Sequence, residues 1–156
     1  MPEAADVQTE TTENNDAEKY LVFSIMDKLY AVPSRNIGEI TLFETVYPLP
    51  LMPSYVLGVV NRYSVPYALF DIGLLFYNTP SPRKKVLIIK DEIDRIAFLI
   101  DDVTGIADIQ NDGLLYMDGS SEADDLTEAV YASFTWKEND VLVLDINKIL
   151  SRATGE

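Results

Sequence analysis

The sequence contains no cysteine and no histidine, and these two absences remove most of the usual side-chain chemistry. Without cysteine the chain has no disulfide, no thiolate nucleophile and no cysteine-ligated metal. Without histidine it has no Ser-His-Asp or Cys-His catalysis, and it lacks the commonest metal ligand. We therefore expect a protein that is not an enzyme and that holds no metal ion or cofactor.

Basic residues are also scarce, with 12 Lys and Arg against 26 Asp and Glu, for a formal net charge of −14. A surface of this sign repels the phosphates of nucleic acids and anionic lipid headgroups. The one basic run, Arg83-Lys84-Lys85, lies in a Pro-flanked loop, and we interpret it as a solvated loop rather than a polyanion site. We expect no nucleic-acid partner.

Long apolar runs are missing as well. No stretch approaches the roughly 18–20 apolar residues that span a bilayer, and the N-terminus lacks the basic and apolar regions of a signal peptide. We expect a cytoplasmic protein without direct membrane insertion. Residues 1–18 are rich in Glu, Thr, Asn and Ala, and this composition predicts a disordered acidic tail.

What the sequence does contain is a series of short strand patterns. Residues 20–25 and 29–32 predict one hairpin, and residues 86–89 and 96–100 predict a second. Each hairpin is followed by an apolar pair with helical i, i+3 spacing, which we interpret as a helical turn. The pairs are Ile37 with Ile40 and Val103 with Ile106, and the offset from Ile37 to Val103 is 66 positions. The recurrence suggests two related lobes.

Further strands are expected at 41–47, 59–60, 65–70, 130–136 and 141–144, with short helices at 72–76 and 146–152. Many short strands without a long helix favour an all-β fold, either one barrel or a pair of barrels.

Acidic residues offer the remaining possibilities for chemistry. Asp101-Asp102 and Asp124-Asp125 are adjacent pairs, but neighbouring side chains of a strand point to opposite faces and do not converge. The run 118–125 resembles a calcium loop, yet Ala123 and Ala129 stand where such a loop needs Gly and Glu. We favour a solvated acidic loop. No glycine-rich phosphate-binding motif is present.

Several motifs resemble those of one known family. They are Tyr20-Leu21-Val22-Phe23-Ser24-Ile25, Tyr30, Ile37-Gly38-Glu39-Ile40, Pro50, Pro53, Gly58-Val59-Val60-Asn61, Phe70-Asp71, 86–89 and 96–106. In order and spacing they resemble the CheW family, adaptors that couple bacterial chemoreceptors to their histidine kinase. The likeness covers residues 20–150. It implies two small SH3-like β-barrel lobes around a shared core, with short helices, in a domain over 19–156. We expect the lobes roughly at 30–84 and 85–145, with terminal segments crossing.

The resemblance also implies a function without chemistry. Family members bind the cytoplasmic tip of methyl-accepting chemoreceptors and the regulatory domain of the chemotaxis histidine kinase, and the assembly forms signalling arrays at the membrane. The resemblance assigns partner binding to positions that correspond here to Ile37, Glu39, Gly58, Asn61, Arg62, Tyr63, Val103 and Ile106.

Other interpretations of these residues remain open. Ile37, Val103 and Ile106 are equally compatible with the core, and Gly58 with a purely conformational role. Tyr63 stands where the family has Arg, and Arg62, one residue earlier, would face the other way along a strand. The chain could instead serve as a regulatory module in another two-component pathway, such as twitching-type motility, with altered kinase coupling. A third possibility is a small β-barrel enzyme or a ligand-binding barrel.

Overall fold

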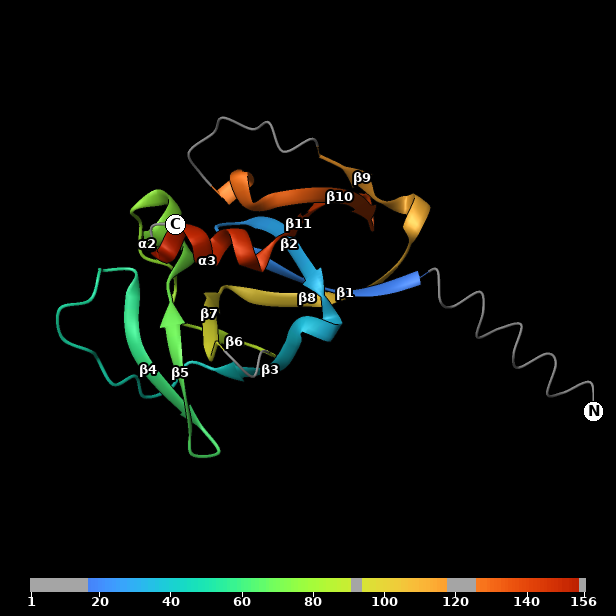
Figure 1. Ribbon diagram of the computed structural model, residues 1–156. Coiled ribbons are helices and arrows are strands. Elements are labelled where there is room, and N and C mark those ends of the chain that lie inside the picture. Colours follow the sequence, from blue (N-terminus) through green and yellow to red (C-terminus); the bar gives the residue numbers. More distant parts are fainter. Residues whose placement is uncertain (1–16, 91–93, 118–125, 155–156) are drawn as a thin grey trace, which may run out of the picture.

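The computed structural model describes residues 17–90, 94–117 and 126–154. Within these residues the chain forms two β-sheets with short helices between and beside them (Figure 1). Sheet A has six strands in the order β8-β1-β2-β11-β10-β9. Its strands are β1 (Ala17–Ile25), β2 (Lys28–Pro33), β8 (Asp102–Gln110), β9 (Leu115–Tyr116), β10 (Val130–Trp136) and β11 (Asn139–Leu144).

Sheet B has five strands in the order β3-β6-β7-β5-β4. Its strands are β3 (Ile37–Leu42), β4 (Val56–Arg62), β5 (Val65–Phe70), β6 (Lys85–Ile89) and β7 (Ile96–Ile100). The helices are η1 (Ser34–Asn36), α2 (Ile72–Tyr77), η2 (Asn111–Gly113), η3 (Leu126–Ala129) and α3 (Ile146–Thr154). No helix of the described residues is long and apolar enough to cross a membrane.

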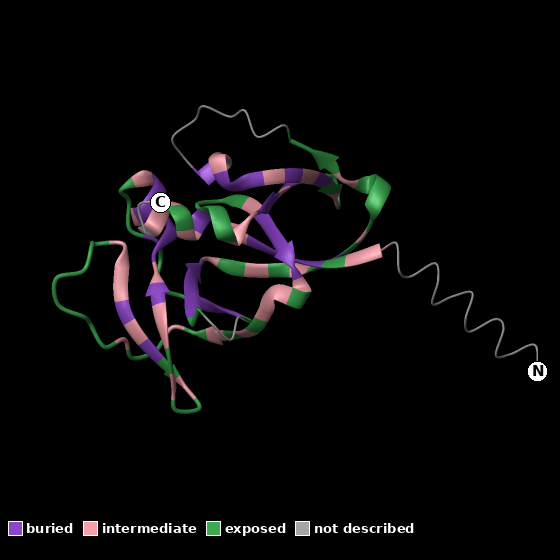
Figure 2. Cartoon of the chain, viewed as in Figure 1, coloured by how far each residue is buried: buried purple, intermediate pink, exposed green. Residues whose placement is uncertain are grey.

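Apolar side chains on opposite faces of the central strands enter different cores. In β1, Tyr20 and Val22 point into a cluster inside sheet A, while Leu21 and Phe23 point into a larger cluster between the sheets. Strands β6 and β7 divide their side chains in the same way between a cluster inside sheet B and the shared one. These strands are therefore buried on both faces, as Figure 2 shows, which explains their continuous apolar sequences. The expected pair of lobes around a shared core is confirmed.

The two sheets exchange one strand each. Strand β3 leaves the β1–β2 hairpin and pairs with β6 in sheet B, whereas β8 leaves the β6–β7 hairpin and pairs with β1 in sheet A. The registers match at the offset of 66 positions, because Ile37 opposes Ile89 just as Val103 opposes Phe23. In each exchanged strand the register shifts directly after the pair just named, which is Ile37 with Ile89 in β3 and Val103 with Phe23 in β8. The repeat suggested by the sequence is thus visible in the strand pairing.

Because of this exchange, the residues that make up each lobe differ from those that the sequence suggested. Sheet B combines residues 37–70 with 85–100, and sheet A combines 17–33 with the strands after residue 101, so neither lobe follows the ranges 30–84 and 85–145. Strand β1 also includes Ala17 and Glu18, which the sequence assigned to the tail. The rest of the tail and the acidic run 118–125 lie outside the described residues.

The predicted helical turns at the two apolar pairs were wrong. Only the 3₁₀ turn η1 forms, and it ends before Ile37; both pairs lie in strands. In a strand, residues three positions apart point to opposite faces. Ile37 and Val103 accordingly pack against the shared core, while Ile40 and Ile106 face outward with 37% and 53% of their surface exposed.

Candidate partner-binding surface

The residues that the resemblance implicates lie on three elements. Ile37 and Glu39 belong to β3, Val103 and Ile106 to β8, and the remaining four to the β4–β5 hairpin. The structure brings Glu39, Arg62 and Tyr63 together in sheet B. It keeps Val103 and Ile106 apart from them, at the edge of sheet A.

Glu39 and Arg62 join the two edges of sheet B. Strands β3 and β4 are the outermost strands of this sheet, so an ion pair between them requires the sheet to curl into a barrel. The Arg62 Nε donates to Glu39 Oε1 at 3.2 Å, and a second guanidinium nitrogen pairs with Oε2. Both side chains are half-buried. The hydrogen bond from Arg62 to Glu39 holds the pKa of Arg62 above its ordinary value.

Tyr63 occupies the tip of the β4–β5 hairpin. Tyr63 and Ser64 both have positive φ, at 53° and 67°, which forms a two-residue turn of the type that matches strand twist. The tyrosine is 84% exposed, and the Arg62 guanidinium carbon lies 5.1 Å from its ring centroid. Arg62 is therefore held between a carboxylate and an aromatic ring. The sequence did not indicate this arrangement, because it depends on the two sheet edges meeting.

Gly58 has a structural reason to be glycine. Its φ is +139°, and a Cβ at this position would lie 2.3 Å from the carbonyl oxygen of Tyr47. Tyr47 and Val59 exchange two backbone hydrogen bonds there, which closes the barrel a second time. This geometry supports the conformational role of Gly58. Its assignment to partner binding stays a prediction.

A small cavity lies between the two closures of the barrel. It has a volume of about 240 Å³, and Leu42, Glu44, Tyr47, Asn61 and Arg62 are among the residues that line it. Leu42 and Tyr47 are 63% and 55% exposed, and Asn61 is exposed opposite Pro66. The cavity, with Tyr63 beside it, is a surface onto which an apolar side chain of a partner could pack.

Two exposed apolar segments were missed by the sequence reasoning. One follows β3 and contains Tyr47, Leu49, Leu51 and Met52; the other contains Leu115, Tyr116 and Met117 around β9. They occupy corresponding places, since Tyr47 pairs with β4 as Leu115 pairs with β10. For the first segment the signal in the sequence was present: large apolar residues alternate with Pro48, Pro50 and Pro53, where no regular core strand can form.

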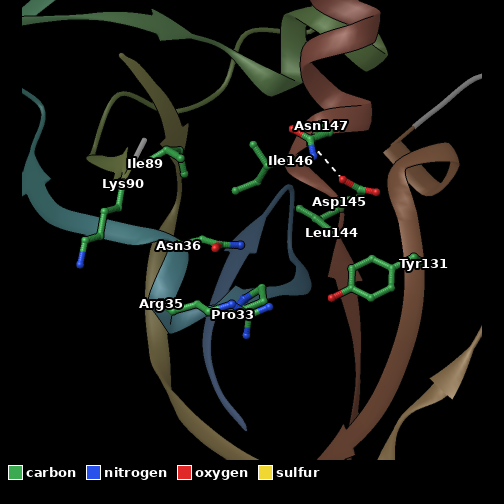
Figure 3. A pocket seen from close by; sticks show the side chains of 10 residues that line it. All are labelled: Pro33, Arg35, Asn36, Ile89, Lys90, Tyr131, Leu144, Asp145, Ile146 and Asn147. Carbon is green, nitrogen blue, oxygen red and sulfur yellow. Dashed lines mark hydrogen bonds between the residues drawn. The ribbon is translucent and has the colours of Figure 1, made fainter. Parts of the chain in front are cut away.

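A larger cavity lies elsewhere, between the lobes. Figure 3 shows its wall: η1 and the end of β6 on one side, with β10, β11 and the start of α3 on the other. Its volume is about 500 Å³, and none of the eight implicated residues lines it.

Among residues 17–90, 94–117 and 126–154, no three acidic side chains gather in a way that could hold a metal ion. Asp101 and Asp102 do not act as a pair. Asp101 accepts from the Met26 amide, while Asp102 accepts from the Lys85 ammonium at 2.6 Å, a contact that lowers the pKa of Asp102. The cluster of Glu39, Arg62 and Tyr63 and the exposed apolar segments can therefore bind another protein through surface contacts.

Comparisons with known proteins agree with this geometry. The family model described as the CheW-like domain matches residues 19–154. Among solved structures, the scaffolding protein TtCheW from Thermoanaerobacter tengcongensis superimposes with a TM-score of 0.72 at 14% sequence identity, covering 83% of this chain and 84% of that one. A search of curated protein sequences found no match.

Proposed function

The chain belongs to the CheW-like domain family, and from this premise we propose that it is a non-enzymatic adaptor coupling chemoreceptors to a chemotaxis histidine kinase. Its two partners would be the cytoplasmic tip of methyl-accepting receptors and the regulatory domain of the kinase. The adaptor would act in the cytoplasm and reach the membrane only through receptor arrays. The observation that carries the proposal is the family match over nearly the whole described chain.

The exchanged strands suit the receptor. Ile106 on β8 and Ile40 on β3 are equivalent residues of the repeat and face outward, away from the shared core. An amphipathic helical hairpin binds through apolar anchors placed in or beside a groove. We propose that the receptor hairpin binds to the outer faces of β3 and β8.

The surface around the β4–β5 hairpin suits the kinase regulatory domain. Glu39, Arg62 and Tyr63 form one cluster beside the exposed apolar segment that contains Tyr47. Apolar and aromatic side chains with a guanidinium among them are typical of the centre of a protein interface.

Tyr63 also favours a second candidate, a CheW-like module with altered kinase coupling in another two-component pathway. The family has Arg at this position, whereas the chain presents an exposed phenol ring with Arg62 behind it. A kinase regulatory domain that binds a guanidinium at this position would contact a phenol ring instead.

Titration calorimetry with a receptor-tip hairpin and with a kinase regulatory domain tests the proposal. We expect dissociation constants in the micromolar range, on the order of −8 kcal/mol or weaker. Ile106→Asp should weaken receptor binding at least about tenfold, which is 1.4 kcal/mol. Thr135→Asp, on an exposed position of β10, is the matched control. Absence of binding to both partners by the folded chain would refute the adaptor role.

The variant Tyr63→Arg separates the two candidates. If the chain couples to a typical chemotaxis kinase, the variant should bind that regulatory domain no better than the natural chain. If Tyr63 reflects a different pathway, Tyr63→Arg should strengthen binding to the typical domain, and the natural chain should bind it poorly.

A further inference from the structure

A trough of two adjoining cavities runs along one side of the molecule. The first is the cavity of about 500 Å³ between the lobes, and the second, of about 490 Å³, lies at the start of β1. Arg35 and Tyr131 line both, so the cavities meet at these two side chains. None of the residues assigned to partner binding takes part in it.

The lining of the trough combines an apolar floor with polar donors. In the first cavity Pro33, Ile89, Leu144 and Ile146 supply apolar surface, and Asn36 and Tyr131 enter from opposite walls (Figure 3). The second cavity adds the phenols of Tyr20 and Tyr116. Burial raises the pKa of Tyr20 to about 12 and that of Tyr131 above its ordinary value, so both phenols keep their protons at neutral pH.

Two cations stand at the trough, Arg35 and Lys90. Arg35 pairs with Glu18, but the two side chains are 66% and 36% exposed, and an ion pair this exposed contributes little. Another carboxylate can therefore replace Glu18 at small cost. Lys90 is exposed and has no ion-pair partner among the described residues. The Asp145 carboxylate instead accepts from the amide of Asn147 at 2.9 Å.

One segment of the chain matches this lining and is attached beside it. Residues 1–16 carry five acidic residues, no basic residue and one branched apolar residue, Val7. They join the described chain at Ala17, which itself lines the second cavity. We propose that the trough is a docking site for residues 1–16 of the same chain, with Val7 on the apolar floor and acidic side chains beside Arg35 and Lys90.

Chain length and attachment favour this occupant. The ten residues from Val7 to Ala17 can span up to about 33 Å, so Val7 can reach either cavity. Covalent attachment gives an effective concentration in the millimolar range, which populates contacts too weak to form between separate molecules. The negative charge of the whole chain opposes docking, but charges beyond about 8 Å are largely screened at physiological salt.

A spin label tests the proposal in the full-length chain. The sequence has no cysteine, so Ala4→Cys provides a unique attachment site. We expect the label to broaden the amide resonances of Asn36, Tyr131 and Asn147, and to leave those of the hairpin tip at Lys137 unchanged. A mixture of spin-labelled unenriched protein with unlabelled isotope-enriched protein should show no broadening.

Two charge-matched variants supply the control. Arg35→Glu with Lys90→Glu should abolish the broadening, while Lys28→Glu with Lys137→Glu, at two exposed hairpin positions, should preserve it. Val7→Asp should also reduce it, and Thr12→Asp should not; this pair keeps the test valid if the Arg35 variant fails to fold. Unchanged resonances in the spin-labelled Ala4→Cys chain, equal broadening in both charge variants, or broadening only between separate copies would overturn the proposal.

Discussion

Replacement of Gly58 should destabilise the fold, because it strains the backbone at a single position. Both its φ of +139° and the 2.3 Å approach of a Cβ to the Tyr47 carbonyl oxygen oppose any side chain. We expect Gly58→Ala to lower the free energy of unfolding by about 2 kcal/mol or more, measured by urea denaturation. Gly38→Ala is the control, because its Cβ would come no closer than 3.5 Å to Ile88. Equal losses in the two variants would contradict the explanation.

The strained geometry at Gly58 also makes this residue a poor place to test partner binding. Gly58→Asp would strain the closure between Tyr47 and β4 as well as alter the surface. Substitutions of exposed side chains, such as Ile106 and Tyr63, separate binding from folding more clearly.

Tyr20 should make stability depend on alkaline pH. Burial, with the neighbouring phenols of Tyr131 and Tyr116, raises the pKa of Tyr20 from 10.0 to about 12. In the unfolded chain the phenol loses its proton near pH 10, so deprotonation then favours unfolding. The stabilising effect is complete below pH 10 and is lost as the pH rises toward 12.

Unfolding free energies measured across this range should fall more steeply for the natural chain than for Tyr20→Phe, which removes the titrating group. Parallel pH profiles of the two proteins would show that Tyr20 does not contribute.

At the scale of elements, α2 is fixed by one buried carboxylate. Asp71 accepts from the Leu74 amide at 3.2 Å, from the Ser81 amide at 3.1 Å and from the Ser81 hydroxyl at 2.6 Å. It thereby caps the helix and holds the loop that follows it. The equivalent residue before α3, Asp145, is only partly buried and accepts from Asn147.

Asp71→Ala should therefore cost about 2 kcal/mol, because buried amide donors lose their acceptor. Asp145→Ala should cost about 1 kcal/mol, the usual effect of losing an exposed cap. Thermal or urea unfolding of both variants measures the difference, and a larger loss for Asp145→Ala would be inconsistent with the burial of Asp71.

The elements also show where sequence patterns stop being informative. The hairpins and the short helix at 72–76 were predictable, because turn residues and local spacing determine them. The i, i+3 pairs were misread, since this spacing in a strand simply alternates core and surface. Arg62 and Glu39 lie 23 positions apart, and only the curled sheet brings them together. The cavities likewise depend on how the lobes pack.

The whole molecule should unfold in one step. Strand β3 follows the hairpin of sheet A but pairs in sheet B, and β8 follows the hairpin of sheet B but pairs in sheet A. Neither lobe can therefore keep its sheet intact if the other lobe opens. We expect a single calorimetric transition whose van't Hoff and calorimetric enthalpies agree. Two separated transitions, or an intermediate retaining one sheet, would show that the exchange does not couple the lobes.

If this chain is an adaptor, it must hold the receptor and the kinase at the same time through two separate surfaces. Sedimentation velocity of the chain mixed with a receptor-tip hairpin and a kinase regulatory domain tests it most directly. We expect a species containing all three components, larger than either two-component complex. If the partners displace each other, or if neither sediments with the chain, the chain is not an adaptor between them.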